Sequence, residues 1–188
     1  MNLEALDIPG AWLLSSKKFE DDRGWFQEWF KHSHFVTEVG YDFVPVQANI
    51  SYSSAGTIRG IHYSTSPAGQ GKLVTVMHGE IDDYAIDLNP QSASFGQWSR
   101  VRLSADNRQS LLLGPHMGHA FQALEPNTVV SYLVTAEFNP DAEKGITPFC
   151  STIGIEWSSA CAPVVSPKDI EAPDLPSQQL AGNLPIFG

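Results

Sequence analysis

Basic residues are scarce in this chain of 188 residues, in which 11 lysines and arginines accompany 21 aspartates and glutamates. The resulting formal charge of −10 disfavours contact with the phosphates of nucleic acids or with anionic membranes, so we expect neither as a partner. A small anionic ligand is still compatible with this charge if a few basic side chains gather in one pocket. The positions of the basic residues therefore matter more than their number.

Long apolar runs are also missing. No segment approaches the roughly 18 consecutive apolar residues that cross a membrane, and the N-terminal segment MNLEALDIPGAW lacks the basic and apolar regions of a signal peptide. The chain has only two cysteines, Cys150 and Cys161, which we expect to be reduced structural thiols. These features predict a cytoplasmic protein with a single domain, residues 1–188.

Helical patterns are rare, and the best of them is a short segment from Lys31 to Val39. Runs of β-branched and aromatic residues, separated by Gly, Pro, Asn and Asp, predict strands instead. The eight predicted strands lie in FVPVQANISYS, TIRGIHYS, GKLVTVMHG, EIDDYAIDLN, WSRVRLSA, QSLLLGP, HAFQALE and TVVSYLVTAEF. They predict an all-β sandwich or barrel, with a turn at Gly79-Glu80 joining two paired strands. We expect the proline-rich tail after Cys161 to wrap around this barrel.

Common cofactor motifs are absent from the sequence. It has no G-x-G-x-x-G turn opening a βαβ unit, no Walker A loop and no G-x-S-x-G nucleophile elbow. A metal-binding cupin is an alternative, but it usually has an H-x-H pair, a nearby carboxylate and a later histidine. His62 is followed by Tyr63 and Ser64, and the pair His32 and His34 falls in the predicted helix. We therefore expect neither a Rossmann-type cofactor nor a P-loop nucleotide site, and the histidine pattern disfavours a catalytic metal.

Polar side chains interrupt several of the predicted strands. The stretch GTIRGIHYS carries Arg59 and His62, and Gln47 and Asn49 alternate on one face of VQANIS. Burying so many polar groups on adjacent strands without a ligand would be costly, so together they indicate a binding site. Residues three apart on a regular strand face opposite sides. Arg59 and His62 reach one pocket only if the strand bulges, and Gly60 is suited to a bulge.

Segments along almost the whole chain resemble the dTDP-4-dehydrorhamnose 3,5-epimerase family, from about residue 19 to 175. They are FEDDRGWFQEWF, VQANISYS, GTIRGIHYS, GQGKLVTVMHGEIDDYAIDL, SFGQW, LSADNRQSLLLGPHMGHAFQAL, VVSYLVTAEFNPDAEKGI and SPKDIEAPDL. The resemblance implies a cupin-type jelly roll that acts as a homodimer, without metal or organic cofactor, on a dTDP-4-keto-6-deoxy sugar. The ketone at C4 acidifies the hydrogens on C3 and C5, because loss of either proton gives an enolate.

The resemblance also assigns roles to residues of this chain. It implies that His62 is the base and that Asp169 orients it, as a carboxylate does for a catalytic imidazole. Tyr132 corresponds to the proton donor, and Lys72 to the cation near the enolate oxygen. Arg23 and Arg59 correspond to ligands of the diphosphate. The other substrate-binding positions are Phe26, suited to stacking on thymine, Glu28, Gln47, Asn49, His119, Phe138, Glu143 and Lys168.

Three features depart from the family pattern. Phe138 stands where many members have Tyr, Leu133 stands where Lys is frequent, and TPFCSTIGIEW lacks the usual Trp-Asn-Asp-Pro. These departures resemble the branch that makes antibiotic deoxysugars, some of whose members invert only C3. Inversion of C3 alone, or of both C3 and C5, therefore stays open. A non-catalytic sugar-nucleotide-binding cupin and a metal-dependent cupin oxygenase or isomerase are the two alternatives of other classes.

Overall fold

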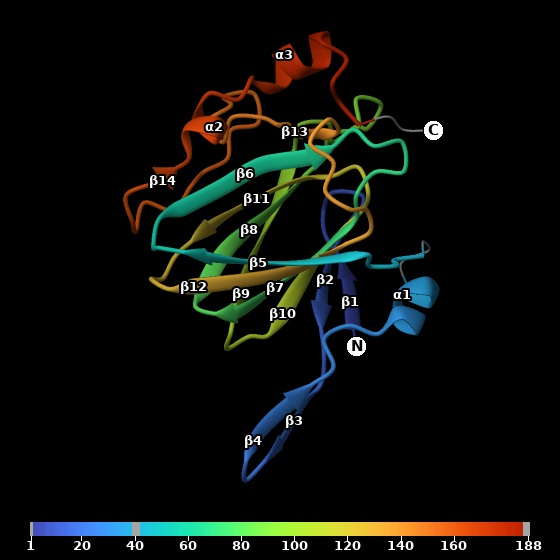
Figure 1. Ribbon diagram of the computed structural model, residues 1–188, viewed down its shortest axis with the longest axis vertical. Helices are drawn as coiled ribbons and strands as arrows, with labels where there is room; N and C mark the ends of the chain where they lie inside the picture. Colours follow the sequence, from blue (N-terminus) through green and yellow to red (C-terminus); the bar gives the residue numbers. More distant parts are fainter. Residues whose placement is uncertain (1, 39–41, 186–188) are drawn as a thin grey trace.

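A computed structural model describes residues 2–38 and 42–185 of the chain as two β-sheets packed face to face (Figure 1). The first sheet contains, in order across it, β1 (Asn2–Ala5), β2 (Ala11–Ser15), β10 (Gln109–Leu113), β7 (Lys72–His78), β12 (Thr128–Val134) and β5 (Gln47–Ser53). The second contains β13 (Glu143–Gly145), β6 (Thr57–Ser64), β11 (Gly118–Ala123), β8 (Glu80–Ile86) and β9 (Trp98–Ser104), with β14 (Val164–Val165) beside β6. Each run that the sequence predicts as a strand overlaps one, which confirms the all-β class.

The core between the sheets follows the two-residue period of the strands. Val74 and Val76 of β7 pack against Ile81 of β8 in this inner cluster. Leu73 belongs to a different cluster on the outer face, where it packs under Phe35 of α1 (His32–Glu38). The predicted helix is thus confirmed, and Val39, where the prediction ended, lies outside the described residues.

The C-terminal segment covers the outer face of the second sheet. Tyr84 and Ile86 of β8 pack there with Ile146, Cys150 and Leu175. This segment also contains α2 (Pro167–Ile170) and α3 (Leu175–Leu180), which lie above β6 in Figure 1. The prediction that the tail wraps the barrel is confirmed, and both cysteines are free thiols, as expected.

The predicted pairing across the Gly79-Glu80 turn is wrong. β7 pairs with β10 and β12, whereas β8 pairs with β9 and β11, so the two strands belong to different sheets. Gly79, with a φ of 79°, turns the chain from one layer into the other. A glycine between two apolar runs fits both a hairpin and such a corner, because the local backbone requirement is similar.

An N-terminal hairpin was not expected from the sequence. β3 (Lys18–Asp21) pairs with β4 (Gly24–Gln27), and the pair projects away from the two-sheet body (Figure 1). Arg108 lies over the ring of Trp25, 3.9 Å from its centroid, which ties the hairpin to the body. In the described part of the chain, no helix is long and apolar enough to span a membrane.

Candidate active site

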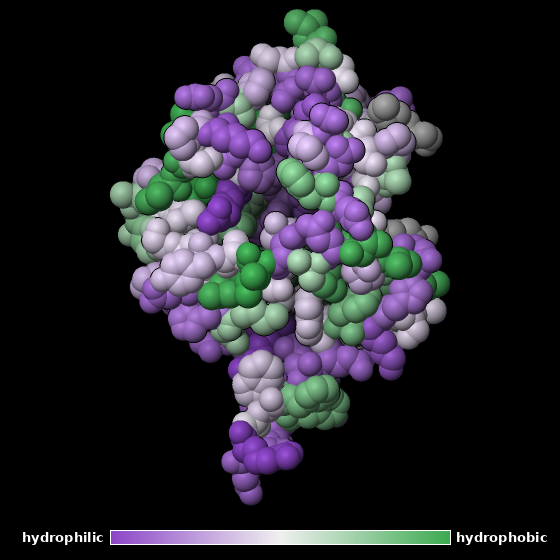
Figure 2. Space-filling model, viewed as in Figure 1, coloured by the Kyte–Doolittle hydropathy of each residue, from purple (hydrophilic) through white to green (hydrophobic). Residues whose placement is uncertain are grey.

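A cavity of about 320 Å³ opens between the two sheets. Figure 2 shows a hollow bordered by hydrophilic side chains near the middle of the face in view. The lining residues come from both sheets and from the C-terminal segment: Gln47, Asn49, His62, Gln70, Lys72, Tyr132, Phe138, Glu143, Lys144 and Lys168. Most of the residues that the sequence singled out therefore lie in one place.

The strands of the first sheet supply one wall through their register. Tyr132 of β12 is the cross-strand partner of Asn49 on β5, and the two strands run antiparallel. Lys72 lies two residues before the core residue Val74 on β7 and so faces the same side. The polar cavity is therefore a continuation of the apolar core toward the end of the sandwich.

The bulge predicted at Gly60 is confirmed. His62 pairs with His119 and Arg59 pairs with Phe121, so two residues of β6 stand opposite the single residue between His119 and Phe121 on β11. Because cross-strand partners share a face, Arg59 and His62 point to the same side although they are three residues apart. Gly60 has a φ of 129°, which side chains other than hydrogen rarely allow.

His62 and Asp169 form a hydrogen-bonded pair at the cavity wall. The distance from His62 Nε2 to Asp169 Oδ1 is 2.7 Å. β14 runs beside the start of β6, and Ser166 then caps α2 through the backbone N–H of Asp169, so the tail delivers this carboxylate to His62. An ionised carboxylate only accepts hydrogen bonds, so Nε2 carries the proton and Nδ1 is the basic nitrogen.

Electrostatics keep Asp169 ionised. Burial raises the pKa of this carboxyl, but the hydrogen bond and charge of His62, the hydroxyl of Ser166 and the backbone of Gly60 together outweigh burial. The pKa of Asp169 therefore lies below its ordinary value. An ionised partner orients the imidazole and stabilises the imidazolium that forms when Nδ1 takes up a proton.

Burial acts in opposite directions on Tyr132 and Lys72. Burial and the negative charge of Glu143 raise the pKa of the Tyr132 phenol, whereas the positive charge of Arg59 lowers it to a smaller extent. The phenol therefore keeps its proton at neutral pH. Burial lowers the pKa of Lys72 below its ordinary value, although the negative charges of Glu143 and Asp83 partly oppose this effect. A protonated phenol and a nearby ammonium are what a proton donor and an enolate-stabilising cation require.

A second hollow of about 470 Å³ adjoins the cavity, and His62 lines both. Arg59 lies in this second hollow, where its guanidinium donates hydrogen bonds to Ser53 Oγ at 3.2 Å and to the carbonyl of Tyr52 at 3.1 Å. Within residues 2–38 and 42–185 this guanidinium makes no further hydrogen bond, so its other N–H groups are available to an anion. Lys168 lines the first cavity, so positive charge borders both hollows on either side of His62.

Four predicted substrate-binding residues lie elsewhere. Arg23 and Phe26 lie on the β3–β4 hairpin. The side chain of Arg23 is 90% exposed and forms an ion pair with Asp21, and Phe26 is 68% exposed. Glu28 follows β4 directly. His119 is the cross-strand partner of His62 but is not among the residues that line the cavity, and its Nε2 lies 2.6 Å from Asp83 Oδ1.

Sequence reasoning did not single out Gln70, Lys144 or Asp83. Gln70 and Lys144 line the cavity. Gln70 lies in a loop and Lys144 in a strand of three residues, so neither belongs to a periodic pattern that would identify it. Asp83 did leave a signal, because two consecutive carboxylates in the apolar run EIDDYAIDL place one of them on the inner face. Within residues 2–38 and 42–185, no group of three or more His, Cys, Asp or Glu side chains is arranged to hold a metal ion.

Comparisons with known proteins give one consistent family. The sequence profile described as dTDP-4-dehydrorhamnose 3,5-epimerase matches residues 5–177. A dTDP-4-dehydrorhamnose 3,5-epimerase of Mycolicibacterium smegmatis is 37% identical over 187 residues, covering 100% of this chain and 92% of the relative. The solved rmlC epimerase of Mycobacterium tuberculosis superposes with a TM-score of 0.96 at 34% identity, covering 100% of this chain and 94% of that one.

A third similar protein has a narrower activity in its description. The structure of ChmJ, a 3'-monoepimerase from Streptomyces bikiniensis in complex with dTDP-quinovose, has a TM-score of 0.92 at 33% identity. The match covers 96% of this chain and 91% of ChmJ. The likeness to these solved epimerases confirms the cupin-type jelly roll that the resemblance implied.

Proposed function

This chain belongs to the dTDP-4-dehydrorhamnose 3,5-epimerase family, and we propose from this premise that it inverts a dTDP-4-keto-6-deoxy sugar in the cavity around His62. The chain is an epimerase of dTDP-sugars in deoxysugar biosynthesis. The main support for placing the reaction in this cavity is the 2.7 Å hydrogen bond between His62 and Asp169, because Tyr132 and Lys72 line the same cavity.

In the proposed mechanism, His62 Nδ1 removes the proton from C3 of the sugar. The electron pair of the C3–H bond forms the C3–C4 double bond, and the C4 carbonyl becomes an enolate whose oxygen is stabilised by the Lys72 ammonium. The Tyr132 phenol then donates its proton to C3 from the opposite face, which inverts this carbon and restores the ketone. Solvent removes the proton from His62 and returns one to Tyr132.

The same geometry supports binding of the nucleotide end. Arg59 and Lys168 supply positive charge beside His62 for the diphosphate, and a guanidinium can contact two phosphate oxygens at once. Phe138 offers a flat face at the cavity rim, and its backbone N–H donates to Gln47 Oε1 at 2.9 Å, which fixes that loop. An aromatic ring at this position is suited to stacking on thymine even without the hydroxyl of a tyrosine.

The homodimer is part of this proposal. Strand β5 forms one edge of the first sheet and carries its polar side chains inward, while Ile50 and Tyr52 are exposed on the opposite face. An exposed apolar face on an edge strand is suited to a second copy of the chain. The projecting β3–β4 hairpin would then bring Arg23, Phe26 and Glu28 to the cavity of the partner.

We also propose the remaining features that the sequence predicted. The chain works as one domain, residues 1–188, in the cytoplasm, without a metal, an organic cofactor, nucleic acid or a membrane as partner. The strongly acidic composition supports the last two points, because 21 acidic residues outnumber 11 basic ones. The basic side chains that border the cavity compensate locally for this charge.

Incubation with dTDP-4-keto-6-deoxyglucose in heavy water tests the function. Inversion through an enolate places solvent deuterium on each carbon that is inverted, so proton NMR of the product reads out the reaction position by position. Deuterium at C3 and C5 identifies a 3,5-epimerase, and deuterium at C3 alone identifies a 3-epimerase. Recovery of undeuterated substrate would contradict the proposal and favour a protein that only binds the sugar nucleotide.

A further inference from the structure

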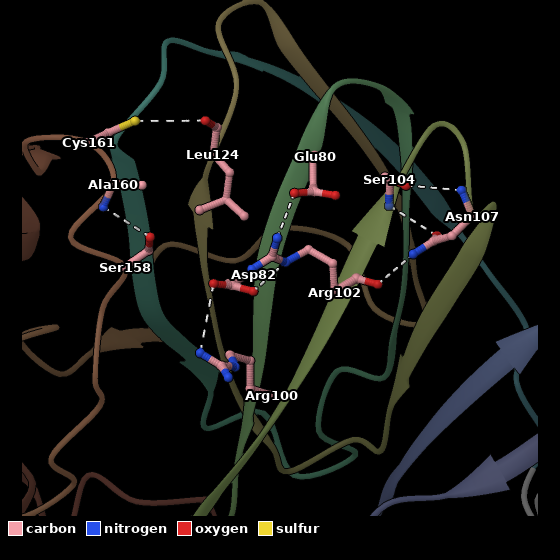
Figure 3. Close-up of polar contacts among 10 residues, drawn as sticks. All are labelled: Glu80, Asp82, Arg100, Arg102, Ser104, Asn107, Leu124, Ser158, Ala160 and Cys161. Carbon is pink, nitrogen blue, oxygen red and sulfur yellow. Dashed lines mark hydrogen bonds and ion pairs between the residues drawn. The ribbon is translucent and has the colours of Figure 1, made fainter.

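Two consecutive carboxylates of β8 have opposite surroundings. Asp82 faces the outer side of the second sheet, where its Oδ1 accepts from Arg102 Nε at 2.8 Å and its Oδ2 lies 4.0 Å from Arg100 (Figure 3). Asp83 faces the space between the sheets, toward His119 of β11. Asp82 thus has two guanidinium partners, whereas Asp83 lies on the side of the catalytic cavity.

Asp83 is wholly buried, with an exposed fraction of 0%. Its Oδ1 accepts a hydrogen bond from Nε2 of His119 at 2.6 Å, and its Oδ2 is buried without a hydrogen-bond partner among the described residues. A buried carboxylate is costly unless its charge and its lone pairs are compensated. A single hydrogen bond compensates only part of this cost, and a nearby cation would compensate more of it.

Lys72 supplies that cation. It is 7% exposed on β7, it lines the cavity, and the charge of Asp83 acts on it across the space between the two sheets. Glu143 of β13 is the other carboxylate near Lys72. The remaining titratable groups of this cavity are His62 on β6, Tyr132 on β12, Lys144 on β13 and Lys168 on α2. Of these two carboxylates, Glu143 lines the cavity, whereas Asp83 is buried outside its lining.

We propose that Asp83 is a positioning residue that holds Lys72 in its ammonium form beneath the C4 oxygen of the substrate, with His119 fixing the carboxylate from the far side. This inference rests on the proposed function of the cavity. A bound sugar blocks solvent from Lys72 and thereby increases the cost of its charge, and Glu143 is a predicted substrate ligand. A buried carboxylate outside the cavity keeps its charge and its place while substrate enters and leaves.

The role also gives His119 a definite task. Its Nε2 carries the proton that Asp83 accepts, because an ionised carboxylate cannot donate one. His119 then acts on the reaction through Asp83 and Lys72. Asp83, held by His119, thus orients the cation Lys72, just as Asp169 orients the base His62.

The test compares Asp83→Asn with the native protein by competitive acetylation. Acetic anhydride reacts only with the neutral amine, so the acetylated fraction of Lys72, measured by mass spectrometry across a pH series, follows its protonation without any need for activity. Loss of the Asp83 charge should move this curve to lower pH. The alkaline limb of kcat should move in the same direction, with kcat at pH 8 reduced about tenfold because a neutral amine stabilises the enolate poorly.

Asp82→Asn is the matched control. It removes a carboxylate of 1% exposure from the adjacent position of the same strand, so it carries a similar structural cost on the opposite face. We expect Asp82→Asn to leave the Lys72 acetylation curve in place. If Asp83→Asn does not fold, Asp83→Ser removes the same charge and leaves room for water beside His119.

An unchanged Lys72 curve in a folded Asp83 variant, together with normal epimerisation by the native protein, would overturn this inference and leave the proposed function intact. A shifted curve in a protein whose native form does not epimerise the substrate would instead support the coupling of Asp83 to Lys72 and contradict the proposed function. The two claims therefore fail in distinguishable ways.

Discussion

His62 donates its Nε2 proton to Asp169 at 2.7 Å, which leaves Nδ1 as the basic atom. Tyr132 keeps its phenolic proton because burial raises its pKa. One residue can therefore accept a proton and the other can donate one at the same pH. Inversion needs both states together, since removal and return of a proton by one group on one face would regenerate the starting configuration.

Tyr132→Phe is expected to separate exchange from inversion. The phenyl ring keeps the packing against the core but lacks the proton that must reach the opposite face. His62 can still remove and return a proton on its own face, so deuterium should continue to enter the substrate while net inversion falls about 10²- to 10⁴-fold, the usual loss for a general acid. Proton NMR in heavy water follows both. An equal loss of exchange and inversion would indicate that Tyr132 positions the substrate instead.

The bulge in β6 connects the element scale to the site. In a regular strand without the bulge, Arg59 and His62, which are three residues apart, would face opposite sides of the second sheet. A Cβ atom at Gly60 would lie 2.5 Å from the Cβ of Ala120 and 2.7 Å from the carbonyl oxygen of His119. The bulge thus requires glycine both for its φ and for the close approach of β11.

Gly60→Ala should therefore destabilise the fold and reduce activity together. We expect a loss of about 1–3 kcal/mol from the strained backbone, increased by the steric clash, and a lower kcat because His62 is displaced from Asp169. Gly182→Ala is the control, because Gly182 has a φ of 68° but a Cβ added there would have nothing within 4 Å. Urea unfolding and initial rates of both variants provide the comparison. Equal effects of the two substitutions would remove the special role of the bulge.

The elements that the sequence predicted are those with a local signal. The alternation of apolar residues located the eight central strands, and the conflict between Arg59 and His62 located the bulge. Strand partners carry no such signal, so the turn at Gly79 was interpreted as a hairpin although it joins two layers. The β3–β4 hairpin was missed because its exposed aromatic side chains follow no buried periodicity.

The site also contains residues that are far apart in the sequence, and only some of them could be predicted. The resemblance paired His62 with Asp169 across 107 positions, and the β14–β6 contact and the Ser166 cap explain physically how they meet. Asp83 was not singled out, because the run EIDDYAIDL does not reveal which of its carboxylates faces the cavity. That distinction depends on the register of β8 against β11, which only the assembled sheet fixes.

At the scale of the whole molecule, the cavity of one chain lacks the hairpin residues that the family resemblance assigns to the substrate. If a partner chain supplies them, two inactive variants should restore each other. We expect a mixture of His62→Ala protein with Arg23→Ala/Phe26→Ala protein, after subunit exchange, to recover about a quarter of native activity, because half of the dimers are mixed and each has one intact site. No recovery in a mixture proven to contain mixed dimers would place Arg23 and Phe26 in their own chain's site.

The central claim is that the cavity around His62 is where the sugar loses its C3 proton. Its most direct test is deuterium wash-in at C3 from heavy water by His62→Ala and native protein, with dTDP binding measured by calorimetry on both. The account predicts that exchange in the variant falls about 10²- to 10⁴-fold while dTDP affinity stays close to native, since the base contacts the sugar and the nucleotide binds to other residues. Native exchange at C3 in a folded His62→Ala protein would contradict the account.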